Sequence, residues 1–184
     1  FPRLFQGHEE IPGLTRPTTT FSDRMTVYLG KRRVDIMQLG RAHTAGDAVI
    51  WVPDEEVMFT GDIVEYHSAC YCGDGHFADW GDTLDVIAGF QPRAIAPGRG
   101  DALIGGDVEL AIESTRDFVQ STYEPVARVP ARGGPPKEAM AAPRAVCDPH
   151  LRDFAIPEHS LPLHIPRAPA AAPRPPPPPP WPAH

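Results

Sequence analysis

The sequence predicts an α/β (α+β) domain that forms part of a layered sandwich of helices and sheets. Four short runs of β-branched and aromatic residues come first, and a helix, a strand and a longer helix follow them. This order fits half of a layered sandwich better than a complete doubly wound parallel sheet. The chain has 184 residues, which is enough for one ordinary domain with a core of its own.

The first part of the chain carries the strand signals. Each predicted strand is short, rich in β-branched or aromatic residues, and bounded by Gly, Pro or Asp. The segment LGKRR predicts a hairpin turn between the first two strands, and PDEE predicts a turn between the last two. The predicted strands are Met25–Leu29, Arg32–Leu39, Asp47–Val52 and Glu56–Gly61.

Helix and strand signals alternate in the next part of the chain. After a long loop over residues 62–81, Asp82 is predicted to cap a short helix that covers residues 82–90. A short buried strand is predicted at residues 93–98. The clearest helix signal runs over residues 107–128, where apolar residues recur on one face at the helical spacing.

Composition changes sharply toward the C-terminus. A weaker helix is predicted over residues 137–146, interrupted by a proline. The last twenty residues, IPRAPAAAPRPPPPPPWPAH, are about half proline and predict a solvated polyproline II segment. A disordered tail is the favoured interpretation, and binding to an SH3- or WW-like groove is the alternative. The predicted organisation is an N-terminal loop (1–17), a sandwich half (18–129), an irregular or helical extension (130–164) and a disordered tail (165–184).

Charge, apolar runs and cysteine count narrow the functional class. The formal net charge is −7, so we expect no nucleic-acid partner. No run approaches the roughly 18 to 20 apolar residues that span a bilayer, and we expect no membrane association. Three cysteines form an odd set that favours a reducing, cytoplasmic compartment. The N-terminus has neither an initiator Met nor a signal-peptide pattern, so we expect the chain to begin inside a longer protein.

A histidine and an aspartate each follow a predicted strand and form a candidate metal site. His43 lies in the turn GRAHTAGD, and Asp62 ends the run EVMFTGD. Two adjacent strands that end in such side chains place both donors at one edge of the sheet. Imidazole nitrogen and carboxylate oxygen are zinc ligands in hydrolytic sites, and an aspartate can bridge two ions. The glycine turn PGRGD, residues 97–101, ends another strand and points to the same edge.

The series GRAHTAGD, FTGD and PGRG resembles the second half of the metallo-β-lactamase superfamily over residues 18–129. The resemblance implies an αββα sandwich and a zinc-dependent hydrolase that uses a metal-bound water. By this resemblance His43 is a metal ligand, and Asp62 is a catalytic, metal-bridging ligand of a two-zinc site. The substrates it implies are small-molecule esters, thioesters or lactam-like compounds.

Two departures from the family pattern bear on activity. The run His-x-His-x-Asp-His does not occur in these residues, and Arg99 stands where the family usually has a histidine. Arginine offers no lone pair to a metal, so Arg99 either grips an anionic substrate group, stabilises an oxyanion, or only supports the turn. Two remaining ligands are too few for a tight zinc site. We therefore expect an incomplete chain that is inactive or nearly so by itself.

The predicted loop after Asp62 is expected to overhang the site. Four of its side chains are predicted to shape a substrate pocket, while Trp80 anchors the loop on the core. A loop that never touches substrate is the alternative, and a structural zinc held through the Cys70–Cys72 pair is disfavoured by its C-x-C spacing. The predicted pocket residues are Tyr66, His67, Tyr71 and His76, together with Arg99.

Two functional hypotheses therefore stand. The first is a zinc-dependent hydrolase of the metallo-β-lactamase superfamily, present as an incomplete chain, with a homo-oligomer as one assembly state open to it. The second is a non-catalytic remnant or interaction protein that carries a Pro-rich tail. Upstream sequence with the His-x-His-x-Asp-His run would favour the first hypothesis.

Overall fold

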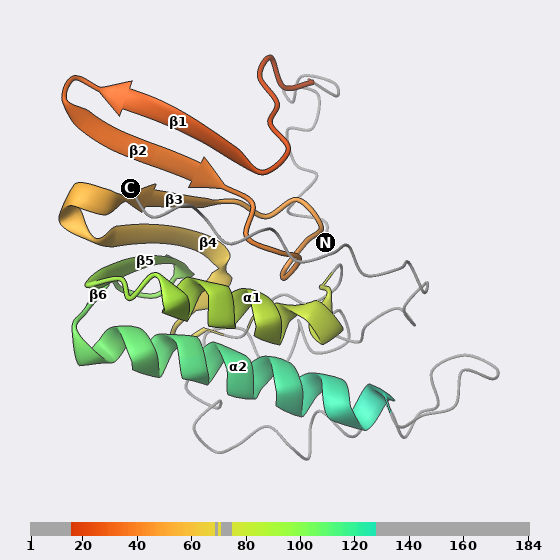
Figure 1. Cartoon of the computed structure of the whole chain (residues 1–184). Coiled ribbons are helices and arrows are strands. Elements are labelled where there is room, and N and C mark those ends of the chain that lie inside the picture. Colours follow the sequence, from red (N-terminus) through yellow and green to blue (C-terminus); the bar gives the residue numbers. More distant parts are fainter. Residues whose placement is uncertain (1–15, 69, 71–74, 128–184) are drawn as a thin grey trace, which may run out of the picture.

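The computed structural model describes residues 16–68, 70 and 75–127, which form one mixed sheet and two α-helices (Figure 1). Most of the predicted N-terminal loop, the helix predicted over 137–146, the extension and the Pro-rich tail lie outside the described residues. The layered α/β class predicted from the sequence is confirmed. In the described part of the chain, neither helix is long and apolar enough to cross a membrane.

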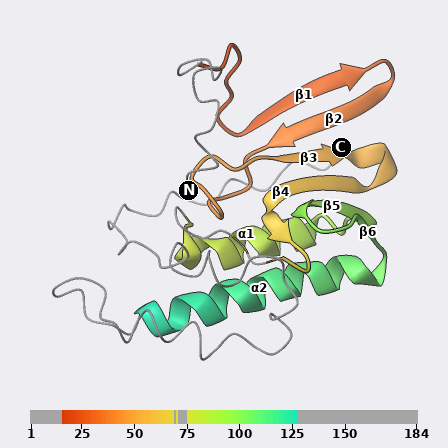
Figure 2. The same cartoon turned by 180° about the vertical axis from the view of Figure 1, so that it is seen from behind.

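Six strands form the sheet, and they stand in the order of the sequence. Strands β1 to β4 pair antiparallel, each with the next. Strands β4 and β5 pair parallel, and β6 pairs antiparallel with β5. A short 3-10 turn, η3 (Pro53–Glu55), joins β3 to β4. Figure 2 shows the same order from behind. The strands are β1 (Arg24–Leu29), β2 (Arg32–Met37), β3 (Val49–Val52), β4 (Val57–Glu65), β5 (Ala94–Arg99) and β6 (Leu103–Ile104).

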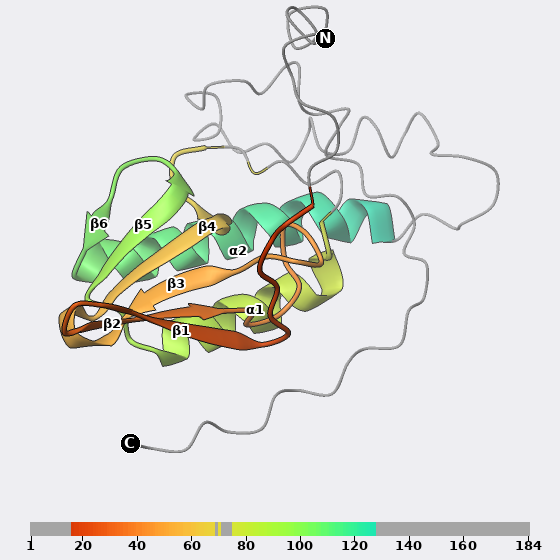
Figure 3. The ribbon, with the colours of Figure 1, turned by 90° about the horizontal axis from the view of Figure 1, so that it is seen from above.

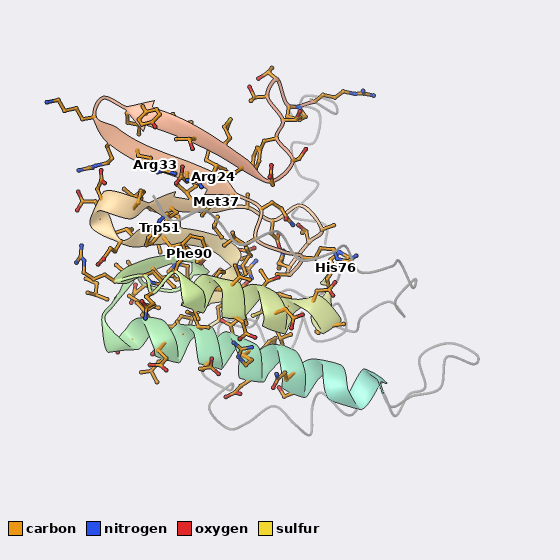
Figure 4. The ribbon with its side chains drawn as sticks, viewed as in Figure 1. Arg24, Arg33, Met37, Trp51, His76 and Phe90 are labelled. Atoms are coloured by element: carbon orange, nitrogen blue, oxygen red, sulfur yellow. The ribbon has the colours of Figure 1, made fainter. Side chains whose placement is uncertain are left out.

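The two helices, α1 (Phe77–Gly89) and α2 (Gly106–Ala127), lie side by side and pack against β4 and β6. The β1–β2 hairpin extends away from them, and α2 runs alongside the sheet when viewed from above (Figure 3). Trp51 of β3 meets Phe90, just after α1, edge to face at 5.5 Å between ring centroids (Figure 4). Fully buried side chains of the sheet and of both helices form one core, among them Met58, Ile95, Leu84, Ile87 and Ala111.

A buried ionic cluster ties β1 to β2. Asp35 is 1% exposed and accepts a hydrogen bond from Thr26 Oγ1 at 2.6 Å. Arg33 Nε also donates to Asp35 at 3.2 Å, and Arg24 forms a close ion pair with the same carboxylate (Figure 4). Because a buried carboxylate is costly without partners, these three donors account for an acidic residue in the middle of a strand.

The other face of the sheet is apolar and open. Side chains alternate between the two faces of a strand, so Ile50 and Phe59, which pair in register, point away from the helices. Ile50 is 38% exposed, Phe59 46% and Ile104 65%. The second layer that a sandwich requires on this face is not formed by any described helix or strand.

The prediction of a loop over residues 62–81 was wrong at both of its bounds. Strand β4 continues to Glu65, because Gly61 adopts a left-handed φ of 53° that bends the strand and lets it keep pairing with β5. Helix α1 begins at Phe77, so Asp82 lies inside the helix and does not cap it. Strand β6 was not predicted. The other strands and α2 differ from their predicted bounds by at most two residues.

Candidate metal centre

The loop that carries His43 is fixed from several sides. Gly40 lies so close to α1 that a Cβ there would stand 2.2 Å from Thr83 Oγ1. Thr83 Oγ1 donates to the carbonyl of Arg41 at 2.9 Å, and the carbonyl of Ala42 accepts from the backbone N of His76 at 2.7 Å. These bonds attach the loop to the start of α1, and so they set where His43 can reach.

Hydrogen bonds within the same loop hold the residues that follow His43. Asp47 accepts from the backbone N of Thr44 at 2.8 Å and from the Thr44 hydroxyl at 2.6 Å. The His43 ring meets Trp80 edge to face, with 6.0 Å between centroids, and the His43 side chain is 15% exposed. Trp80 is fully buried and donates from Nε1 to the carbonyl of Ile63 at 3.0 Å. Trp80 is thus the core anchor that the sequence predicted, although it stands in α1.

Asp62 lies on β4 where this strand approaches β5 most closely. A Cβ on Gly98 would stand 2.1 Å from Asp62 Oδ1 and 2.6 Å from the backbone N of Asp62, so only glycine fits there. Asp62 Oδ2 lies 3.8 Å from His43 Nε2. The structure therefore brings the two predicted metal ligands together.

Glu65 joins this pair, and the sequence analysis missed it. One ligand atom each of His43, Asp62 and Glu65 can be chosen so that all three lie within 4.8 Å of one another. Glu65 is 2% exposed, and among the described residues no hydrogen bond of normal geometry reaches either of its carboxylate oxygens. Its position after the bend at Gly61 brings it to the same edge as Asp62. The signal that could have found it is the carboxylate spacing D-x-x-E, read on a strand that continues past Gly61.

Burial makes Glu65 unusually hard to ionise. The pKa of Glu65 is raised from 4.5 to about 7, and desolvation is the largest cause. The charge of Arg99 opposes this rise, the charge of Asp62 adds to it, and the interaction with the Ser68 hydroxyl lowers the pKa with the smallest effect. A cation beside the carboxylate favours the ionised form. One imidazole and two carboxylates are ligand types that zinc accepts, and catalytic zinc sites commonly use three protein ligands. The donor set of the chain therefore fits a zinc ion.

Arg99 ends β5 at the same edge of the sheet. Its Nη2 lies 3.9 Å from Asp62 Oδ2, and its Nε lies 3.9 Å from Glu65 Oε1. The Arg99 side chain is 44% exposed, so the guanidinium also faces solvent. A positive charge thus stands beside the two carboxylates, at the position where the resemblance expects a histidine.

The predicted pocket residues lie in different surroundings. Tyr66 directly follows Glu65, and its backbone N donates to the carbonyl of Arg99 at 3.1 Å. The rings of Tyr66 and His67 stack at 3.9 Å, and His67 is exposed. His76 stands at the start of α1 (Figure 4), and Tyr71 lies outside the described residues. Contact of these residues with a substrate stays a prediction.

A separate groove of about 310 Å³ lies between α1 and α2. Its lining includes Phe77, Asp82, Arg116 and Val119 and none of the predicted site residues. Arg116 is tied down there by Asp85 at 2.7 Å and by the carbonyl of Gly81 at 3.1 Å. The guanidinium of Arg116 on α2 therefore links the two helices through these bonds to α1.

Two curated relatives found by sequence comparison carry the same name. The chain is 33% identical over 122 residues to a type 2 metallo-β-lactamase of Bacteroides fragilis, a match that covers 61% of this chain and 47% of the relative. It is 23% identical over 75 residues to a type 2 metallo-β-lactamase of Pseudomonas aeruginosa, covering 41% of this chain and 30% of that protein. No protein-family model matches the chain. The chain thus spans less than half the length of either relative.

Solved structures share the fold. A metallo-β-lactamase from Pontibacter korlensis superposes with a TM-score of 0.52 at 17% identity, covering 64% of this chain and 54% of that one. The metallo-β-lactamase IND-7 gives a TM-score of 0.51 at 22% identity, covering 64% and 53%. At these identities the likeness concerns the fold alone, and about half of each solved chain has a counterpart here.

Proposed function

Sequence and fold both support a place for this chain in the metallo-β-lactamase superfamily, and we propose that its residues form part of a zinc-dependent hydrolase site. The observation that carries the proposal is the approach of His43 Nε2 to Asp62 Oδ2, 3.8 Å apart at one edge of the sheet. These side chains come from separate segments that the fold holds rigidly, which is what a metal site requires.

The roles we propose follow from the chemistry of each side chain. His43 supplies an imidazole nitrogen, and Asp62 supplies a carboxylate oxygen that is also able to bridge two ions. Zinc, when bound, supplies a water nucleophile whose pKa is lowered toward neutrality. Arg99 holds a fixed positive charge beside the site, where it is suited to an anionic substrate group or to the negative charge that develops on a substrate oxygen.

We propose a small-molecule lactam, ester or thioester as substrate. The support is that the relatives are metallo-β-lactamases and that Tyr66 and His67, which directly follow Glu65 in the sequence, form a stacked pair of rings. The chain spans less than half of each curated relative, so we propose that a second metal ion needs ligands beyond those of this chain. By itself the chain is then inactive, and the odd cysteine count favours a cytoplasmic location.

A second candidate function rests on the open apolar face of the sheet. Ile50, Phe59 and Ile104 are exposed there, and such patches commonly mark interaction surfaces. A non-catalytic interaction protein is the function that this face would support if the centre binds no metal.

Zinc titration of the purified 184-residue chain tests the hydrolase proposal. We expect zinc binding that weakens at least about tenfold in His43→Ala and in Asp62→Asn, because each removes a ligand. The matched control is Asp54→Asn, an exposed aspartate in the η3 turn at the opposite end of β4. Absence of zinc binding, or unchanged affinity in Asp62→Asn, would refute the proposal.

Turnover of a chromogenic cephalosporin by the same preparation tests the expected inactivity. We expect no hydrolysis above the zinc-only background. Stoichiometric zinc together with turnover would show that the residues of this chain suffice for catalysis.

A further inference from the structure

Glu65 is held at the centre by its backbone. The hydroxyl of Thr115 on α2 donates to the carbonyl of Glu65 at 2.8 Å and accepts from its backbone N at 3.2 Å. The carbonyl of Ala111, one turn earlier in α2, lies 2.9 Å from the same Thr115 oxygen, so the two carbonyls compete for the single hydroxyl proton. The end of β4 is thus hydrogen-bonded to α2 through the backbone of Glu65.

The carboxylate of Glu65 is fully buried with little hydrogen bonding, which is unusual for an acidic side chain. Its side chain has no exposed surface, and among the described residues no hydrogen bond of normal geometry reaches either oxygen. The Ser68 hydroxyl lies near the carboxylate but has only the smallest effect on its pKa. Arg99 is a neighbouring cation among the described residues, but its Nε lies 3.9 Å from Oε1, beyond hydrogen-bond length. Buried carboxylates in proteins are as a rule hydrogen-bonded, paired, or bound to a metal ion. The unfilled acceptor capacity of Glu65 faces His43 and Asp62.

We propose that Glu65 is a third metal ligand, which completes a His43–Asp62–Glu65 site for one divalent cation. The three ligand atoms lie within 4.8 Å of one another. One imidazole nitrogen and two carboxylate oxygens are ligand types that zinc and similar divalent ions accept. This inference rests on the proposed function, since it takes His43 and Asp62 as the other two ligands.

Arg99 explains why the site needs this additional carboxylate. Arg99 cannot coordinate a metal, and its charge opposes a nearby cation. With Asp62 alone, the charges of carboxylate and guanidinium cancel and leave nothing to attract a divalent ion. Ionised Glu65 gives the group a net charge of −1 and adds a donor atom on the side where Arg99 provides none. Glu65, on β4, thus supplies a ligand in place of the histidine expected at position 99. Arg99 itself does not bind the metal.

Titration of the metal-free full chain with Co²⁺, followed by visible absorption, tests this assignment. We expect Glu65→Gln to weaken Co²⁺ binding at least about tenfold and to change the Co²⁺ spectrum, because glutamine keeps the shape but is a poor ligand. Glu109→Gln, at an exposed position in the first turn of α2, is the matched control and should bind as the unchanged chain does. Co²⁺ should also raise the unfolding temperature of the unchanged chain and of the control, and should raise that of Glu65→Gln less at the same Co²⁺ concentration.

Two outcomes separate this inference from the proposed function. Unchanged Co²⁺ affinity in Glu65→Gln, with binding lost in Asp62→Asn, overturns the role of Glu65 and leaves the hydrolase proposal standing. Absence of Co²⁺ and Zn²⁺ binding by the unchanged chain overturns both. If Glu65→Gln does not fold, Glu65→Asp replaces it. The shorter side chain withdraws the carboxylate from the other ligands, so the same weakening is expected and an unchanged affinity again refutes the assignment.

Discussion

Glu65 couples the stability of the domain to the chemistry of its candidate centre. The carboxylate is buried, so folding costs more when it is ionised than when it is protonated. Arg99 offsets part of this cost, whereas Asp62 adds to it. A cation bound beside this carboxylate would lower its pKa and favour the ionised form.

The pH dependence of unfolding follows from the raised pKa of Glu65. In the folded chain this pKa is about 7, against an ordinary value of 4.5, so between these pH values the folded state holds a proton that the unfolded state has lost. The free energy of unfolding should therefore fall as the pH rises from about 4.5 to 7, by up to roughly 3 kcal/mol, and then level off. Urea unfolding in the presence of a chelator measures it.

Glu65→Gln isolates this contribution. The amide does not titrate, so the variant should lose most of the fall in stability between pH 4.5 and 7, and above pH 7 it should be more stable than the unchanged chain. Glu109→Gln should keep the original pH profile. Parallel profiles for Glu65→Gln and the unchanged chain would show that Glu65 is ionised normally in the folded state.

At the level of secondary structure, the close approach of β4 and β5 builds the centre. The parallel pairing of these strands shifts register between Phe59 and Gly61 and again between Gly61 and Glu65. These irregularities bring Asp62 and Glu65 to the same edge, although a regular strand would place residues three apart on opposite faces. Gly98 permits the approach because it has no side chain.

Gly98→Ala should damage both the sheet and the centre. Its Cβ would fall 2.1 Å from Asp62 Oδ1 and 2.6 Å from backbone atoms of Asp62 and Gly61, so the strands must separate locally. We expect a loss of about 2 kcal/mol in the free energy of unfolding, together with weaker zinc binding, measured by urea unfolding and zinc titration.

Gly46→Ala is the control for this substitution. No atom lies within 4 Å of a Cβ built at Gly46, and its φ does not fall in the left-handed region. We therefore expect Gly46→Ala to leave stability and zinc affinity almost unchanged. Equal behaviour of the two variants would contradict a tight β4–β5 contact at Asp62.

At the level of the complete fold, the helices cover one face of the sheet and leave the other face apolar. Leu29 and Ile104 are both 65% exposed, and Ile50 and Phe59 lie between them on the central strands. Apolar surface removed from water contributes roughly 25 cal/mol per Å², so covering this face is favourable whatever the partner is. A second copy of the chain is one such partner.

We expect the chain to self-associate through this face. Sedimentation equilibrium should show mass that rises with concentration, and the pair Ile50→Thr and Phe59→Thr should shift the chain toward the monomer, because threonine keeps the strand preference and reduces the apolar surface. Leu110→Gln is the control, since Leu110 is 58% exposed but lies on α2. Association that is unaffected by the paired substitution would place the contact elsewhere.

The candidate centre was predictable in part. His43 and Asp62 were recognisable because each follows a strand signal and carries a metal-ligating group, and the structure places them together. Glu65 was not, because the strand was predicted to end at Gly61 and its continuation past this residue depends on pairing with β5. The start of α1 was missed for a related reason: Phe77 and Trp80 become helical through burial against the sheet, and no side chain caps the helix.

Local pattern in the amino-acid sequence was sufficient to predict strands β1 to β3, strand β5 and helix α2. It was also sufficient to predict the layered α/β class and the chemical types of two ligands. Periodicity and turn residues act over a few positions, and these elements depend on little else. Tertiary structure decided the length of β4, the start of α1 and the burial of Glu65. Each of these depends on contacts between segments distant in the chain: β4 with β5 at Gly98, Trp80 with Ile63, and Thr115 with Glu65. Desolvation and strand register arise only when such segments pack, and for that reason the third carboxylate of the centre could be recognised only in the folded chain.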